Sequence, residues 1–393
     1  MTPLRILLFP FSCLYGLGIS LWKGMYRLGV YKTGKVSVPV LSVGNVTVGG
    51  NGKTPLVIAL TKWLENRGHH VGILSRGYGR EKSPGKKVLV FSGRKIMGNP
   101  VGDPPDPKVT GDEPALISAR VPSAMIALSS DRLEGARALL PFSPSVIVMD
   151  DGFQSLELFQ DLSFVLIAER DFLKILEQSG WGCRDLLPGG RYREGEDALL
   201  RASAVVVTLE EEHSPEEMEQ LRSRFDLYFQ KRFPSRPLLS VLFQKIVVSG
   251  IVCQDGLESG ETPGVEDPGM LRGRRVVLVS GIAAPGRFFR TVSGYGAEIL
   301  GHLSWSDHAP WNEGRQKEIL TFLDSVSRKG TPEMILTTEK DLVKWPKPIQ
   351  LPYTVYSVQI ESCLLEPAHW ESVLSSAVPK SYAFPEGRFP DGD

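Results

Sequence analysis

A glycine-rich loop, TVGGNGKT from Thr47 to Thr54, lies between an apolar run and a segment with helical periodicity. The run from Val36 to Val43 is typical of a buried strand, and the segment from Pro55 to Asn66 is typical of a helix with proline in its first turn. The loop fits the phosphate-binding pattern GxxxxGK[ST], except that threonine replaces the first glycine. Strand, loop and helix together predict a nucleotide-binding unit.

The residue types in this loop suit the chemistry of phosphate binding. Its glycines let backbone N–H groups turn toward phosphate oxygens, Lys53 can reach the β- and γ-phosphates, and the Thr54 hydroxyl can join a magnesium shell. An ordinary glycine-rich turn is the alternative, and it leaves the strand and helix on either side unexplained. The predicted nucleotide-binding residues are Thr47, Val48, Gly49, Gly50, Asn51, Gly52, Lys53 and Thr54.

Short, mostly β-branched apolar runs separated by loop- or helix-length spacers predict parallel α/β sheet along most of the chain. The first series comprises Val71–Leu74, Val88–Phe91, Ala124–Leu128, Val146–Met149, Phe164–Ala168 and Ala204–Leu209. A second series comprises Arg274–Ile282, Glu298–Leu303 and Glu333–Thr338. The expected fold class is α/β, with a P-loop NTPase-like parallel sheet domain followed by a second, smaller α/β domain.

The boundary between the two predicted domains lies near residue 237. The segment Pro237–Gly250 is typical of a linking strand, and Gln254–Met270 is an acidic loop or insertion rich in glycine and proline. We expect a nucleotide-binding P-loop domain over 35–236, a smaller α/β domain with linking strands over 237–378, and a poorly packed tail over 379–393.

The N-terminal segment, residues 1–34, has a charge and hydropathy pattern of its own. No Asp or Glu occurs before Glu65, and the uncharged run Ile6–Trp22 is about 25 Å long as a helix, the short limit for a bilayer span. Basic and aromatic residues follow it, as at a membrane interface. A cleaved signal peptide and a buried core helix are the alternatives. We favour a membrane-associated helix, with the rest of the chain on the cytoplasmic side.

Two acidic motifs are candidates for metal binding and catalysis. In SVIVMDDGFQ, an apolar strand delivers Asp150 and Asp151 at its C-terminal end, where carboxylates can hold magnesium, although such residues are often turn formers. In GDEP, Asp112 and Glu113 precede an apolar helix, a position that equally suits an N-cap and a first-turn acid. The predicted metal-shell residues are Thr54, Glu113, Asp150 and Asp151.

Overall charge and cysteine usage exclude other classes of function. Lys and Arg number 45, as do Asp and Glu, so no global field attracts nucleic acid. The four cysteines lack CxxC spacing, which predicts neither a zinc site nor a disulfide framework.

Seven motifs occur in order: VGNVTVGGNGKTP, SRGYGR, GDEP, DDGFQ, LLPGGRYRE, the SDH of LSWSDHAPW, and TTEKD. With them the chain resembles the tetraacyldisaccharide 4'-kinase family over about residues 5 to 350. The resemblance implies that ATP, with Mg²⁺, phosphorylates the 4'-hydroxyl of a lipid-linked disaccharide 1-phosphate, giving the lipid IVA 1,4'-bisphosphate at the cytoplasmic face of a bacterial inner membrane.

The resemblance also implies roles for individual residues. Asp112 would be the catalytic base, supported by His308 of the SDH motif, while Lys53, Arg132 and Arg193 would steady phosphate charge. Arg76 and Tyr78 of SRGYG would shape the substrate side. Each arginine could instead form an ordinary ion pair.

Two other functions use the same phosphate loop. A GTPase-like switch protein would need a guanine-reading motif, and TEKD (Thr338–Asp341) has the wrong spacing for one. A soluble kinase for a small metabolite leaves the apolar N-terminus unexplained.

Overall fold

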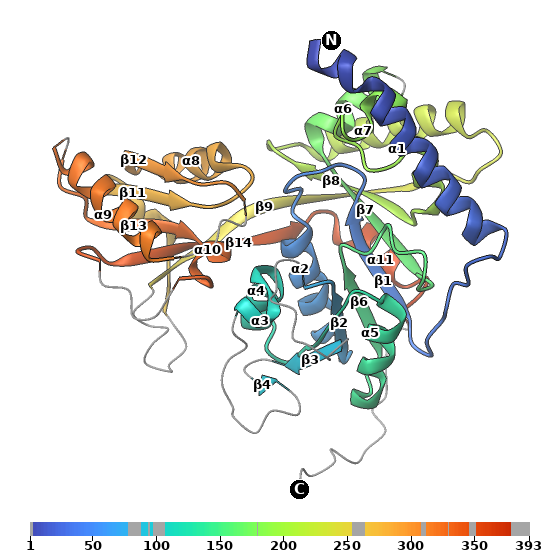
Figure 1. Ribbon diagram of the computed structural model, residues 1–393, viewed down its shortest axis with the longest axis horizontal. Coiled ribbons are helices and arrows are strands. Elements are labelled where there is room, and N and C mark those ends of the chain that lie inside the picture. The colour runs from blue at the N-terminus through green and yellow to red at the C-terminus, as the bar shows by residue number, and fades with distance from the viewer. Residues whose placement is uncertain are drawn as a thin grey trace, which may run out of the picture.

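The computed structural model of this chain describes residues 3–77, 88–92, 95–96, 107–178, 180–253, 264–307, 312–328, 330–345 and 351–378. Within this part of the chain, fourteen strands form one continuous sheet, in the order β12-β11-β13-β14-β9-β8-β7-β1-β6-β2-β5-β3-β4, with β10 paired to β9. Figure 1 shows two α/β halves joined by the long strands β9 and β14. The predicted α/β class, with a P-loop-type sheet and a second α/β unit, is confirmed.

The N-terminal half is a mainly parallel sheet with helices on both faces. Its strands are β1 (Val40–Asn45), β2 (Val71–Ser75), β3 (Val88–Ser92), β4 (Lys95–Ile96), β5 (Met125–Ser129), β6 (Val146–Asp150), β7 (Leu162–Ala168) and β8 (Ala204–Leu209). The helices are α2 (Lys53–Glu65), α3 (Pro107–Thr110), α4 (Asp112–Arg120), α5 (Arg132–Leu139), α6 (Glu169–Gln178), α7 (Pro215–Arg232) and α11 (Pro367–Leu374). All residues of β1, β2, β6, β7 and β8 are buried, as expected of parallel strands covered on both faces.

The second half repeats the α/β pattern on a smaller scale. It contains β11 (Arg275–Ser280), β12 (Glu298–Ser304) and β13 (Met334–Thr338), with α8 (Pro285–Gly294), α9 (Glu313–Ser327) and α10 (Glu339–Leu342). The strand β9 (Ser240–Cys253) is parallel to β8 and antiparallel to β14 (Val355–Leu364), which in turn is parallel to β13. These two strands make the sheet continuous, and β10 (Val265–Glu266) is added at the edge of β9.

Several element boundaries differ from those predicted. The first strand begins at Val40 rather than Val36, because Pro39 cannot donate to a ladder. Helix α2 begins at Lys53, two residues before Pro55. The run Val88–Phe91 forms a strand antiparallel to β5, not parallel, and β14 was not predicted. Of the predicted insertion Gln254–Met270, residues 254–263 lie outside the described residues, and so does the tail 379–393.

The helix α1 (Pro3–Arg27) packs along one side of the N-terminal half and presents an apolar outer face (Figure 1). On this face Leu7, Leu14 and Leu21 are each more than 60% exposed. Among the described helices, the stretch Arg5–Arg27 alone has the length and hydropathy of a membrane span, and only 11% of its most apolar window is buried. Such low burial argues against the core-helix alternative.

The inner face of α1 holds the segment that carries Arg193. The Ser12 hydroxyl donates to the Leu186 carbonyl (3.0 Å), and the Tyr15 hydroxyl donates to the Arg193 carbonyl (3.0 Å). The buried Lys23 ammonium contacts Asp197 (2.7 Å) and Glu194 (3.4 Å). The apolar helix is therefore attached directly to the candidate site.

Candidate active site

The phosphate loop follows β1 and ends at the first turn of α2. Gly52 precedes the helix at φ 83°, a left-handed conformation that side chains disfavour, and a Cβ there would lie 3.0 Å from Ile246. Gly49 is also in a positive-φ conformation, at 121°. This geometry exposes the backbone N–H groups at the start of α2, where a helix attracts anions. Thr54 follows Lys53 in that first turn.

Neighbouring segments brace the loop. The Asn51 side chain donates to the Thr47 hydroxyl (2.8 Å), and the Thr208 hydroxyl donates to the Asn51 carbonyl (2.9 Å). On the other side, the backbone N–H of Arg193 donates to the Val46 carbonyl (2.7 Å). The loop therefore has a fixed shape, which favours tight and specific phosphate binding.

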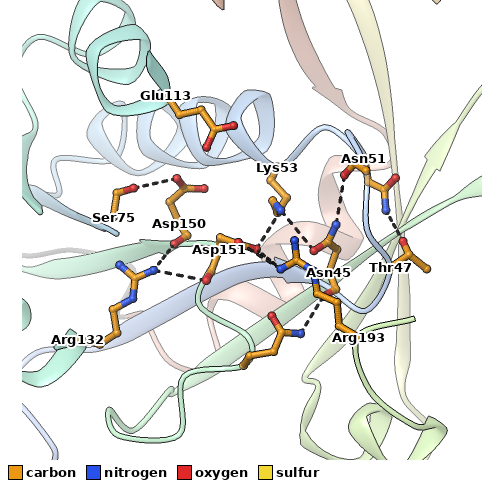
Figure 2. Close-up of polar contacts among 12 residues, drawn as sticks. Asn45, Thr47, Asn51, Lys53, Ser75, Glu113, Arg132, Asp150, Asp151 and Arg193 are labelled. Atoms are coloured by element: carbon orange, nitrogen blue, oxygen red, sulfur yellow. Dashed lines mark hydrogen bonds and ion pairs between the residues drawn. The ribbon is translucent and has the colours of Figure 1, made fainter. Parts of the chain in front are cut away.

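Lys53, Asp151 and Arg193 form a compact charged group beside the loop (Figure 2). The Lys53 ammonium lies 2.9 Å from Asp151 Oδ1 and 3.3 Å from Asn45 Oδ1. The Arg193 guanidinium Nη1 lies 3.1 and 3.2 Å from the two Asp151 carboxylate oxygens. Burial raises the pKa of Asp151, but the two cations outweigh burial and hold it below the ordinary value. Asp151 is therefore an anion that aligns the Lys53 and Arg193 cations beside the loop.

Asp150, at the end of β6, is buried beside this group. Its Oδ2 accepts a hydrogen bond from the Ser75 hydroxyl (3.2 Å), while its Oδ1 is buried without a hydrogen-bond partner among the described residues. Burial, Glu113 and Asp151 raise the pKa of Asp150 to about 7, against the opposing effect of Lys53 and Arg132. A buried carboxylate with an unsatisfied oxygen suits a cation.

Arg132 opens α5 and is fully buried under the two aspartates. Its Nη2 donates to the Asp150 carbonyl (3.1 Å), and its Nε and Nη1 have no hydrogen-bond partner among the described residues. Burial and the nearby Arg76 lower the pKa of Arg132 to about 10. In this structure Arg132 holds the backbone of the acidic turn rather than pairing with a carboxylate.

Asp112 and Glu113 are the first two residues of α4, so the predicted first-turn position is correct. Figure 2 shows the Glu113 carboxylate directed toward Asp150 and Lys53. The acids also contact the second half of the chain, since Lys344 Nζ lies 3.3 Å from Asp112 Oδ2 and Lys340 Nζ lies 3.3 Å from Glu113 Oε1. The GDEP and DDGFQ acids therefore gather at one end of the parallel sheet.

The acids fit a magnesium ion that is shared with a nucleotide. Among the described residues no group of three or more His, Cys, Asp or Glu side chains could by itself enclose a metal. Magnesium typically takes one or two carboxylates and completes its shell with water and substrate phosphates, and the unpartnered Asp150 Oδ1 has the chemistry of such a ligand. The assignment of Thr54, Glu113, Asp150 and Asp151 to this shell stays a prediction.

Replacing Asp150 by Asn should stabilise the protein in the absence of metal and nucleotide. The pKa rises from 3.8 to about 7 on folding, so the folded state holds this proton more tightly. The contribution of Asp150 to stability is therefore largest below about pH 4 and is lost as the pH rises toward 7. At about 1.4 kcal/mol per pKa unit, the gain for D150N at pH 8 has an upper bound of about 4 kcal/mol.

Urea unfolding of wild type and D150N at pH 4, 6 and 8, in the presence of a chelator, measures this effect. We expect the stability difference to grow from pH 4 to about 7 and then to level off. A D150N protein less stable than wild type at pH 8 would contradict the proposed ionic state of the site.

Sequence reasoning missed several residues that the structure brings into the site. Gln154, within DDGFQ, donates to the Asn45 carbonyl (2.9 Å), and Asn45 contacts Lys53. Lys340 belongs to TTEKD, a motif for which the sequence alone predicts no role, and Lys344 lies three residues beyond its end. His308 and Tyr78 lie outside the described residues, so their predicted roles stay predictions. Arg76 is exposed at the end of β2.

A phosphate loop between a buried parallel strand and a helix, with acids converging on its lysine, defines a P-loop phosphotransferase. The family model for tetraacyldisaccharide-1-P 4'-kinase matches residues 4–379. The chain belongs to this family. It is 31% identical to tetraacyldisaccharide 4'-kinase of Syntrophus aciditrophicus (87% of this chain, 85% of that protein) and 33% identical to that of Pelobacter propionicus (86% and 82%).

A solved structure has the same arrangement. LpxK of Aquifex aeolicus, crystallised in complex with ATP, superposes with a TM-score of 0.68 at 28% identity, covering 95% of this chain and 99% of that one. The predicted family is confirmed.

Proposed function

We propose that this protein transfers the γ-phosphate of ATP to the 4'-hydroxyl of a tetraacyldisaccharide 1-phosphate, giving the 1,4'-bisphosphate. The observation that carries the proposal is the contact of Lys53 with Asp151, at 2.9 Å, within a group that the Glu113 carboxylate also faces (Figure 2). The ATP-bound Aquifex structure and the family supply the nucleotide and the acceptor class. The acceptor's sugar hydroxyl would approach the acids of α4.

In this mechanism the protein positions the reactants and neutralises charge. The loop N–H groups and Lys53 bind the phosphates, with Arg193 adding a second cation at the same carboxylate. Asp112 accepts the proton of the attacking hydroxyl, assisted by His308. Bound magnesium would neutralise phosphate charge, held by Asp150 and Asp151 with Glu113 and Thr54. Arg132 fixes the backbone of the two aspartates.

The organisation of the chain would serve this reaction at a membrane. Residues 1–34 would form the membrane-associated segment, 35–236 the kinase domain, 237–378 the linking strands and the smaller domain, and 379–393 the tail. Within 237–378, α11 returns to pack on the kinase half. The apolar face of α1 would enter the cytoplasmic surface of the inner membrane, where the acyl chains of the substrate reside. Because Tyr15 of α1 contacts the Arg193 carbonyl, the membrane surface and the phosphate site would be about one helix width apart.

Glutamate substitutions on the outer face of α1 test this placement. Leu14 and Leu21 are 65% and 62% exposed, and each buried leucine contributes about 1.5–3 kcal/mol to membrane binding. We expect a Leu14→Glu/Leu21→Glu variant to shift from the membrane pellet to the supernatant in a vesicle sedimentation assay, with ATP binding unchanged. These substitutions keep the inner contacts of Ser12, Tyr15 and Lys23, which deletion of the helix would remove.

Leu227 on α7 provides the matched control, because it is a leucine of a different helix that is equally exposed, at 69%. The Leu227→Glu variant should sediment with vesicles like wild type. Equal sedimentation of the α1 variant and wild type would contradict membrane docking through this face.

Transfer of labelled phosphate tests the reaction itself. The purified protein is incubated with γ-labelled ATP and tetraacyldisaccharide 1-phosphate in detergent micelles, and the product is located by mass spectrometry and phosphorus NMR. We expect one labelled phosphate at the 4' position, with ATP preferred to GTP. Transfer to a soluble sugar alone, or a preference for GTP without transfer, would favour the two alternative functions.

A further inference from the structure

The motif TTEKD forms a rigid turn at the end of β13. Thr338 caps α10, with its hydroxyl accepting from the Asp341 backbone N–H (3.2 Å) and donating to Asp341 Oδ2 (2.7 Å). The same Oδ2 accepts from the Gly281 backbone N–H (2.9 Å), which joins α10 to the end of β11. Two of these hydrogen bonds hold the turn together, and the third fixes it to the end of β11 in the smaller half.

Two lysines project from this turn toward the acids of α4. Lys340 and Lys344 are four residues apart and therefore share a face of the turn. Lys344 Nζ contacts Asp112 (3.3 Å), and Lys340 Nζ contacts Glu113 (3.3 Å). The lysine side chains are only 19% and 11% exposed, so water screens these contacts weakly.

Lys340 also contacts Asp307 of the SDH motif, at 3.2 Å. Its single ammonium therefore joins an acid of the kinase half to an acid of the smaller half. Both carboxylate oxygens lie within 3.3 Å of the same Nζ, so without this cation the two anions would be close neighbours that repel each other.

A second ion pair aligns the same two elements. Arg120, at the end of α4, contacts Glu339 of α10 at 2.8 Å and Glu361 of β14 at 2.5 Å, and its side chain is 8% exposed. Helix α4 is thereby held at both ends, by Arg120 at its C-terminus and by the two lysines at its N-terminus. Arg120 fixes the distance between the halves, which leaves Lys340 to set how Asp307 meets Glu113.

We propose that Lys340 is a positioning residue that holds Asp307 of the smaller half against Glu113 of the GDEP motif, and so aligns the two halves for phosphate transfer. This inference rests on the proposed kinase function. The reaction depends on alignment to within about 1 Å, and a misplacement of that size costs about 10²-fold in rate. Lys340 contacts Glu113 and Asp307 rather than the phosphate loop, so its loss should reduce turnover and leave nucleotide binding intact.

Steady-state kinetics of Lys340→Met, Lys340→Arg and Lys317→Met test the inference in the full-length protein. Methionine keeps the length and apolar stem of lysine but removes its charge, and Lys317 is an exposed lysine of α9 in the same half. We expect K340M to lower kcat between about 10- and 100-fold with KM for ATP unchanged. K340R should recover most of the lost rate, and K317M should match wild type.

A double-mutant cycle with Asp307→Asn separates docking from a general structural role. If Lys340 and Asp307 act as a unit, the double variant K340M/D307N should transfer phosphate about as slowly as K340M alone. Hydrogen–deuterium exchange gives a readout that needs no turnover. Residues 112–120 and 298–307 should exchange faster in K340M than in wild type or K317M.

Additive losses in the cycle, a raised KM for ATP in K340M, or unchanged exchange in both segments would overturn the inference. A wild-type protein that transfers no phosphate would overturn the proposed function instead. In that case the exchange comparison still decides whether Lys340 docks the two halves.

Discussion

The Asp112→Asn variant is expected to transfer phosphate at least about a hundredfold more slowly than wild type while still binding Mg-ATP. Asparagine keeps the size of the side chain and its place in the first turn of α4 but cannot accept the proton of the sugar hydroxyl. The Asp112 side chain is 16% exposed and lies 3.3 Å from the Lys344 ammonium. A water molecule from bulk solvent is therefore poorly placed to replace this carboxylate as the base. Single-turnover transfer rates and ATP titrations measure the two properties separately.

Asp324→Asn on α9 is the matched control, because Asp324 is exposed and remote from the acids of α4. It should leave both the rate and ATP binding unchanged. Near-normal turnover of D112N would remove Asp112 from the role of base.

The Lys53→Met variant should lose about 10²–10³-fold in transfer rate through the loss of a single charged donor at the phosphates. The change also leaves Asp151 with Arg193 as its remaining close cation, so the negative charge near the β- and γ-phosphates becomes less well neutralised. We therefore expect weaker ATP binding together with the slower rate. Competition with a fluorescent adenine nucleotide measures the binding.

Lys62→Met tests whether any lysine of α2 has this effect. Lys62 lies at the other end of the same helix and contacts Glu361 at 2.7 Å. It should retain wild-type binding and rate. An equal loss in K62M and K53M would indicate damage to the helix rather than to a phosphate site.

The sequence predicts the parts of the site that depend on local pattern. Loop TVGGNGKT, the strand that ends in Asp150 and Asp151, and the first-turn acids Asp112 and Glu113 each combine a short motif with its own strand or helix. Because parallel strands present their carboxyl ends at one edge of the sheet, the loop after β1 and the acids at the end of β6 must converge. The approach of Lys53 to Asp151 follows from this alternation, whereas Asp112 and Glu113 open a helix and their place in the site does not follow from a strand end.

The remaining features depend on contacts between distant segments, which no local pattern encodes. Strand β14 is recognisable through its pairing with β9, and β3 is antiparallel because of how it returns to β5. The attachment of Arg193 to α1 through Tyr15 spans 178 residues, and the approach of Lys340 to Glu113 spans 227. The positive φ of Asp151, 47°, lies in the left-handed region that aspartate tolerates better than most residues, but no local pattern in the sequence indicates it.

Calorimetric titration of the wild-type protein with ATP, with and without Mg²⁺, tests most directly whether the loop and its acids form a triphosphate site. We expect saturable binding of one ATP per chain that is strengthened by Mg²⁺ and lost in K53M. A wild-type protein that binds no adenine nucleotide, or binds it equally with Mg²⁺ and with a chelator, would contradict the account.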